Sequence, residues 1–294
     1  MLPNPRTADV ATVRPSEVRA IPASVAREGI FDTRNAADAC RWAAGDEFKP
    51  GGRMNTKSDI PPTENHPNLL AGILKRIGTL AIFFVLIALI LFLSAGRLNW
   101  IWAWVYLGIC LVSVVINASI TLRTSPETIA ERGELKMTKK WDKVISGLYA
   151  LAMYFALPLV AGLDVRFGWA RDLSVAWHVA GAVVLAAGLE LAAWAMIANA
   201  YFSTAVRIQS ERGHTVCSNG PYRFVRHPGY VGFILQSISV PFLLGSLWAQ
   251  ILGITATVLM IIRTSLEDRT LQAELPGYQD YIQKVRYRLV PGIW

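Results

Sequence analysis

Two polar stretches in the last third of the chain hold most of the residue types that could bind a ligand. The first contains Gly-Pro-Tyr at 220–222 and Arg-His-Pro-Gly-Tyr at 226–230, and the second contains Arg263, Glu267 and Asp268. Gly-Pro and His-Pro steps form turns that bring the backbone close to a ligand. Tyrosine rings offer faces to an adenine ring or a sulfonium, and carboxylates accept hydrogen bonds from ribose hydroxyls. These residue types suit a cationic, nucleotide-like cofactor.

Arg263 stands one helical turn before Glu267, on the same face of a predicted helix. Its guanidinium can pair with that carboxylate or bind an anionic substrate through its planar fork. The three cysteines, Cys40, Cys110 and Cys217, are widely scattered and show no metal-ligand spacing. We therefore predict no metal site and no cysteine chemistry.

The elements that must position these residues are long apolar segments. Hydrophobic residues make up 53% of the 294-residue chain and charged residues only 17%, against about a quarter in soluble domains. Apolar blocks of this length cross a bilayer as helices. The blocks lie at 77–95, 99–120, 144–163, about 175–200 and 230–262. The last is too long for one straight span and is interrupted near Pro241 and Gly245, which predicts a tight helical hairpin or two slightly short spans.

These segments predict an all-α, polytopic membrane bundle with about five or six transmembrane segments. We expect a tail at 1–68 that is mostly disordered, a bundle of four spans at 69–200 and a ligand-binding region at 201–294. Met54 precedes a polar stretch and then the first apolar block, so it is a candidate for the native start of translation.

The net charge of +8 could indicate nucleic acid, but the cations lie between apolar segments, which indicates membrane orientation instead. We therefore predict no nucleic-acid partner. On the cytoplasmic side we place 75–76, the basic loop at 132–143 and everything after 200 except the hairpin. Few cations remain for the opposite side: Arg97, Arg166 and Arg171. Under the positive-inside rule, both polar stretches face the cytoplasm.

The ordered Gly-Pro-Tyr, Arg-His-Pro-Gly-Tyr-Val-Gly and Glu-Asp…Leu…Tyr…Val…Arg…Pro pattern resembles the isoprenylcysteine carboxyl methyltransferase family. That family belongs to a wider group of membrane methyltransferases that includes phospholipid N-methyltransferases. The resemblance covers roughly 202–291. It implies a helical enzyme without a Rossmann domain, an S-adenosyl-L-methionine pocket built by the C-terminal segments, and a lipophilic small-molecule, lipid or lipidated substrate that enters from the bilayer. The family usually has two consecutive Glu where this chain has Glu267 and Asp268, which implies an altered geometry of the site.

The resemblance also implies a set of site residues. Arg226 and Arg263 are the candidates for binding the substrate carboxylate. The residues expected to line the cofactor site are His214, Gly220, Tyr222, His227, Pro228, Tyr230, Glu267 and Asp268.

Two kinds of acceptor remain open. A carboxylate is already ionised at pH 7 and needs only orientation, for which Arg226, Arg263 and Arg288 are available. An amine would first have to lose a proton to a base, for which Glu267 or His227 is available. We favour the carboxylate, and with it O-methylation.

Alternative functions remain open beside this interpretation, and some residues have structural roles instead. A phospholipid N-methyltransferase would share the fold and cofactor. Sterol-type reductases that use a nicotinamide cofactor resemble this C-terminus, but they typically have Asn and an acidic residue where this chain has Gly229 and Phe233. A transport or scaffold protein would leave the ordered motifs unexplained.

Tyr278 and Tyr281 are interpreted as packing residues. Glu190, inside an apolar block, is either functional or paired within the bundle.

Overall fold

A computed structural model describes residues 67–124, 139–203, 205–210 and 213–294. Within these residues all the regular structure is helical, with no strand, so the predicted all-α fold is confirmed. The expected tail at 1–68 falls outside the described residues except for its last two positions, and so does Met54. Most of the basic loop at 132–143 is also outside them.

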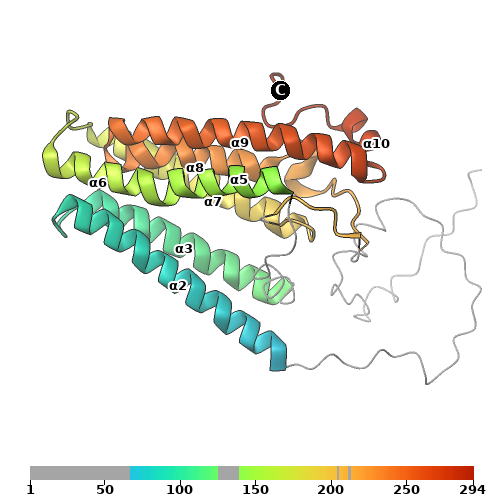
Figure 1. Ribbon diagram of the computed structural model, residues 1–294, viewed down its shortest axis with the longest axis horizontal. Coiled ribbons are helices and arrows are strands. Elements are labelled where there is room, and N and C mark those ends of the chain that lie inside the picture. The colour runs from blue at the N-terminus through green and yellow to red at the C-terminus, as the bar shows by residue number, and fades with distance from the viewer. Residues whose placement is uncertain (1–66, 125–138, 204, 211–212) are drawn as a thin grey trace, which may run out of the picture. The chain divides into compact units, whose positions relative to one another are not determined.

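Eight α-helices and two short segments of other helix types make up the regular structure of the described residues (Figure 1). Their bounds are α2 Pro67–Ala95, α3 Ile101–Thr124, α5 Lys140–Ala150, α6 Leu157–Phe167, α7 Val175–Ala198, α8 Pro228–Leu244, α9 Leu247–Glu274 and α10 Tyr278–Lys284. The π-helix η2, Leu151–Ala156, joins α5 and α6 into one continuous element, and the 3₁₀ helix η4, Gly220–Arg223, precedes α8.

Five elements are long and apolar enough to cross a membrane, and α8 is a shorter apolar helix beside them. The five are Leu74–Ala95, Ile101–Arg123, Lys140–Phe167, Val175–Ala198 and Leu247–Glu274. Many large apolar side chains on these helices are exposed on the protein surface, as expected where lipid is the solvent. The chain is an integral membrane protein with a helical bundle, as predicted.

The predicted terminal hairpin is present, and its two helices differ in length. α8 ends at Leu244 and Gly245 caps it with a φ of 81°, a left-handed conformation that glycine adopts without steric cost. α9 has 28 residues, or about 42 Å, whereas α8 has 17, or about 25 Å. α9 therefore continues past the end of the apolar block, and its last turns carry the second polar stretch.

α7 and α8 pack with their backbones in contact, side by side in Figure 1. A Cβ on Gly232 would lie 2.5 Å from the carbonyl oxygen of Gly188, so neither position tolerates a side chain at this separation. Small residues at such contacts are how membrane helices approach closely. This contact fixes α8, which begins at the Arg-His-Pro motif, against the end of α7.

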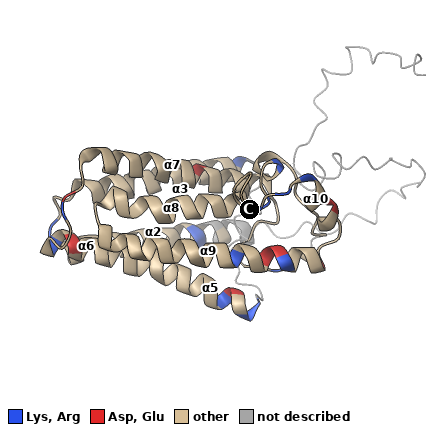
Figure 2. Ribbon diagram, turned by 90° about the horizontal axis from the view of Figure 1, so that it is seen from above, with Lys and Arg blue, Asp and Glu red and all other residues tan. Residues whose placement is uncertain are grey.

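Charged residues lie mainly at the ends of the helices, and the middle of the bundle holds few of them (Figure 2). One end holds the last turns of α9, the start of α5 and α10, and the other holds the turn after α6. This distribution matches a membrane-spanning bundle whose two polar stretches share one end.

Candidate functional site

A pocket lies between the start of α8, the last turns of α9, α10 and the segment that follows α7. We call residues 201–203 and 205–208 the pocket strap, since they line this pocket in the segment that follows α7. Other parts of the lining come from His227 and Tyr230 of the first polar stretch and Glu267 of the second. The hairpin thus brings the two polar stretches together, as the sequence predicted.

The Arg-His-Pro turn is held by the chain terminus. The backbone N–H groups of Arg226 and His227 donate to the carbonyls of Tyr287 and Arg288, at 2.9 Å each. His227 then serves as the N-cap of α8, with Pro228 at the first helical position, where its missing N–H costs no hydrogen bond. Because these backbone contacts fix the turn, the two side chains leave it in defined directions.

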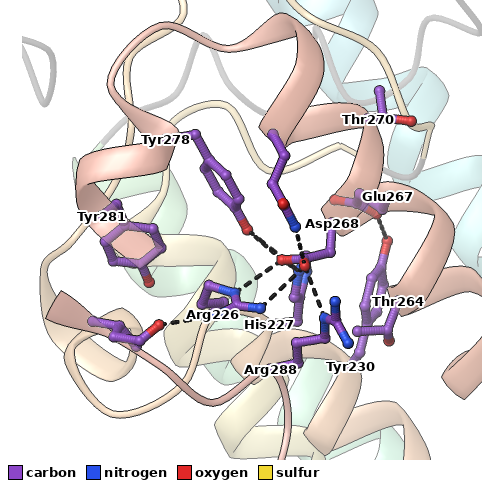
Figure 3. A network of polar contacts seen from close by, with 12 residues as sticks. Arg226, His227, Tyr230, Thr264, Glu267, Asp268, Thr270, Tyr278, Tyr281 and Arg288 are labelled. Carbon is purple, nitrogen blue, oxygen red and sulfur yellow. Dashed lines mark hydrogen bonds and ion pairs between the residues drawn. The ribbon is translucent and has the colours of Figure 1, made fainter. Parts of the chain in front are cut away.

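Asp268 is the centre of a buried polar network, which we call the Asp268 cluster (Figure 3). Its carboxylate has no exposed surface and accepts hydrogen bonds from five side chains. The donors are Arg226 Nε at 2.9 Å and Nη2 at 3.1 Å, Arg288 Nε at 2.8 Å, Tyr278 Oη at 2.9 Å, Gln272 Nε2 at 2.7 Å and His227 Nε2 at 3.2 Å. A buried charge is tolerated when it is paired and hydrogen-bonded in this way.

Tyrosines support this cluster from α10. Burial, and after it the Asp268 carboxylate, raises the pKa of Tyr278, so its phenol stays protonated and acts as a donor. Tyr281 donates to the carbonyl of Tyr222 at 2.6 Å, and burial raises the pKa of Tyr222 as well. These rings connect the short helices η4 and α10 to the ends of α8 and α9.

Arg226 reaches both the cluster and the pocket. Besides its two bonds to Asp268, its Nη1 donates to the carbonyls of Val285 at 3.1 Å and Arg286 at 2.7 Å. Four of its five N–H groups are therefore used within the protein. Among the described residues no acceptor is found for the fifth, on Nη2, which is the one donor this guanidinium can offer to an anion.

Glu267, next to Asp268 in sequence, has a different environment. Its side chain is half-buried at the pocket wall and accepts a hydrogen bond from the hydroxyl of Tyr230. The guanidinium carbon of Arg263 lies 5.2 Å from the centroid of the Tyr230 ring, within the range of a cation–π contact. Of the two neighbouring acids, Glu267 is the one that lines the pocket.

His214 lies on the strap side of the pocket, stacked on Tyr201 with ring centroids 4.5 Å apart. Its Nδ1 accepts from the backbone N–H of Gln209 at 3.3 Å. This contact and the stack hold the imidazole at the pocket wall.

The sequence-predicted residues fall into two groups. Those that line the pocket are His214, Tyr222, Arg226, His227, Tyr230 and Glu267. Those nearby that do not line it are Gly220, Pro228, Arg263 and Asp268. Gly220 adopts a φ of 57° at the start of η4, Pro228 begins α8, and Arg263 lies behind Tyr230. The direct contacts predicted for these four with cofactor or substrate stay predictions.

Sequence reasoning missed Asp142. This residue stands in the segment interpreted as a basic topology loop, yet its carboxylate accepts from Arg263 Nε at 2.8 Å and is almost fully buried. A lone acid among Lys139, Lys140 and Lys143 is a signal that could have identified it. Tyr278 packs in the core as expected, and it also donates to Asp268.

Glu190 has a partner, but its side chain is exposed on α7. It accepts a hydrogen bond from Ser113 at 3.0 Å. Of the two roles expected for Glu190, the structure shows the paired one. Its partner Ser113 lies on α3 and was not identified from the sequence.

Comparisons with known proteins agree with this geometry. Residues 174–273, which include α7, the pocket strap, α8 and nearly all of α9, match the isoprenylcysteine carboxyl methyltransferase (ICMT) family. Two curated relatives, each described as a probable protein-S-isoprenylcysteine O-methyltransferase, come from Oryza sativa subsp. indica and subsp. japonica. Each is 32% identical to this chain over 104 residues.

The aligned part is 34% of this chain and 53% of each relative, so the chain spans about half the length of the relatives it matches. The match includes every pocket-lining residue predicted from the sequence, from His214 to Glu267. The C-terminal part of this integral membrane protein is thus similar to the ICMT family, as its motifs indicated.

Proposed function

We propose that the protein is an S-adenosyl-L-methionine-dependent methyltransferase of the membrane, which methylates the carboxylate of an isoprenylcysteine-like or other lipophilic acid. The observation that carries the proposal is the pocket itself. Six of the motif residues, contributed by segments on both sides of an apolar hairpin, converge on one pocket. The similarity to the ICMT family over the same residues supports it.

The residues present fit this cofactor. The pocket combines aromatic faces from Tyr222 and Tyr230, imidazoles from His214 and His227, and the carboxylate of Glu267. Aromatic faces and a carboxylate favour a cation such as a sulfonium or ammonium, and the remaining polar groups can bind a nucleoside. These five residues would hold the cofactor, which supplies an electrophilic methyl group when bound.

The protein's own contribution is positioning. A carboxylate acceptor is ionised at neutral pH, so it needs no general base, only an approach to about 3–3.5 Å with water excluded. We assign the orientation of that carboxylate to the remaining Nη2 hydrogen of Arg226, at the pocket wall. Arg263 lies against the ring of Tyr230. It would bind the same carboxylate directly once that ring shifts, or would influence it through the ring.

The acceptor would come from the bilayer. The pocket lies at the ends of apolar helices, so a lipophilic acid can keep its tail in the membrane while its head group enters. We place this end of the bundle on the cytoplasmic side, since the cations of α5, α9 and α10 gather there (Figure 2).

The test is to incubate membranes that contain the protein with methyl-tritiated S-adenosylmethionine and identify the labelled product. A base-labile label on a lipophilic acid or lipidated cysteine supports the proposal. A base-stable label on a lipid amine would show N-methylation instead, and no transfer together with nicotinamide binding would show a reductase. The matched control is His227→Ala, which should abolish labelling.

A further inference from the structure

Asp142 is an isolated buried acid at the start of α5. Its exposed fraction is 1%, although Lys140 and Lys143 beside it are exposed. Burying a carboxylate is costly unless each oxygen finds strong donors. The hydrogen-bond partners of Asp142 therefore indicate the role of this buried carboxylate.

The two carboxylate oxygens of Asp142 bind two different segments beside the pocket. Oδ1 accepts from Arg263 Nε of α9 at 2.8 Å and from Ser146 Oγ at 3.2 Å. Oδ2 accepts from the backbone N–H of Val206 at 2.8 Å. Val206 is a buried residue of the pocket strap and lines the pocket.

From Arg263 the contacts continue to the ligand-facing edge. Its guanidinium lies over the ring of Tyr230, and the Tyr230 hydroxyl donates to Glu267. A single carboxylate thus connects the strap, through Val206, with Tyr230 and Glu267, which also line the pocket. Asp142 itself does not line the pocket.

We propose that Asp142 is a positioning residue that sets where the strap lies relative to Tyr230 and Glu267, and so sets the affinity for the cofactor. The proposal rests on the proposed function, because it takes the pocket to be the cofactor site. The alternative role for Asp142 is to hold α5 against α9 and nothing more. The chain offers a control for that alternative, since Lys139 and Glu274 pair the same two helices at the exposed end.

The experiment measures binding of S-adenosylhomocysteine to the full-length protein in detergent by calorimetry, together with hydrogen exchange of the peptide that contains the strap. Asp142→Asn keeps the size of the side chain, but its NH₂ group cannot accept from Val206 or Arg263. We expect the Kd to rise about tenfold, as loss of one charge-assisted hydrogen bond implies. We also expect exchange to accelerate in the strap while α2 and α3 are unchanged.

Two further variants separate positioning from helix docking. Lys139→Gln should leave both the Kd and the strap exchange as in the wild type. In an Arg263→Gln background, Asp142→Asn should raise the Kd by a smaller factor than it does in the wild type, because one of the two contacts is already lost.

Asp142→Glu is the second variant in case the amide does not yield folded protein. It keeps the charge beside Arg263, but one more methylene cannot leave both oxygens in place, so the Kd should still rise. Wild-type affinity and wild-type strap exchange in both Asp142 variants would overturn the proposal. If the wild type itself fails to bind S-adenosylhomocysteine, the proposed function fails instead.

Discussion

Asp268 and Glu267 are neighbours on α9, yet they belong to regions with different tasks. The Asp268 cluster is closed: the carboxylate has no exposed surface and accepts from five side chains of four segments (Figure 3). Glu267 is half-buried at the pocket wall, with Tyr230 as its described donor. Two acids of one motif thus have different surroundings, Asp268 joining the segments around it and Glu267 lining the pocket.

The largest effect should come from Asp268→Ala. Removing this carboxylate leaves Arg226 buried without its main partner, and breaking a buried pair in this way costs about 3–5 kcal/mol. We expect a steep loss of folded protein, measured as yield and thermal unfolding in detergent. A variant that melts at the wild-type temperature would refute the assignment of this cluster to stability.

Glu267→Gln should affect function and spare the fold. The amide oxygen can still accept from Tyr230, but the negative charge facing the pocket is lost. A hydrogen bond to a charged group contributes about 2 kcal/mol, which corresponds to roughly 30-fold. We expect methyl transfer to fall by this factor with an unchanged unfolding temperature. A large loss of stability at unaltered activity would reverse the roles of the two acids.

Tyr278→Phe tests how much a single donor contributes to the stability of the Asp268 cluster. It removes one of the five donors while the ring still fills the core. The expected loss is about 1–2 kcal/mol of unfolding free energy, smaller than for Asp268→Ala, seen as a lower denaturant midpoint. Equal effects of the two variants would mean that Tyr278 alone accounts for the stability of the cluster.

Lys139→Gln should have the smallest effect. Lys139 and Glu274 are both partly exposed, and surface ion pairs contribute about 0–1 kcal/mol. Neither unfolding nor methyl transfer should change measurably. A clear loss of activity would show that the start of α5 acts on the pocket by a route other than Asp142.

The sequence predicted the parts of this structure that depend on local pattern. Apolar length identified the spans, and Pro241 with Gly245 identified the hairpin. Ordered motifs identified six residues that line the pocket, since aromatic rings, imidazoles and charged side chains are recognisable by type.

The parts that it could not predict depend on distant contacts. The division of roles between Glu267 and Asp268 follows from which way each side chain points on α9, which the motif does not state. Asp142 is joined to Arg263 across 121 positions of sequence, and no periodicity links the two. The end of α9 was also not predicted from the sequence, because the helix continues to Glu274 after its apolar residues stop.

Whether the pocket binds the cofactor, with Glu267 facing it, is tested most directly by calorimetry. The titrant is S-adenosylhomocysteine, and the wild-type protein and Glu267→Gln are both purified in detergent. We expect one saturable site per chain in the wild type and roughly 30-fold weaker binding in a variant that unfolds at the same temperature. Absence of binding to the folded wild type, or equal affinity in the two proteins, would contradict this expectation.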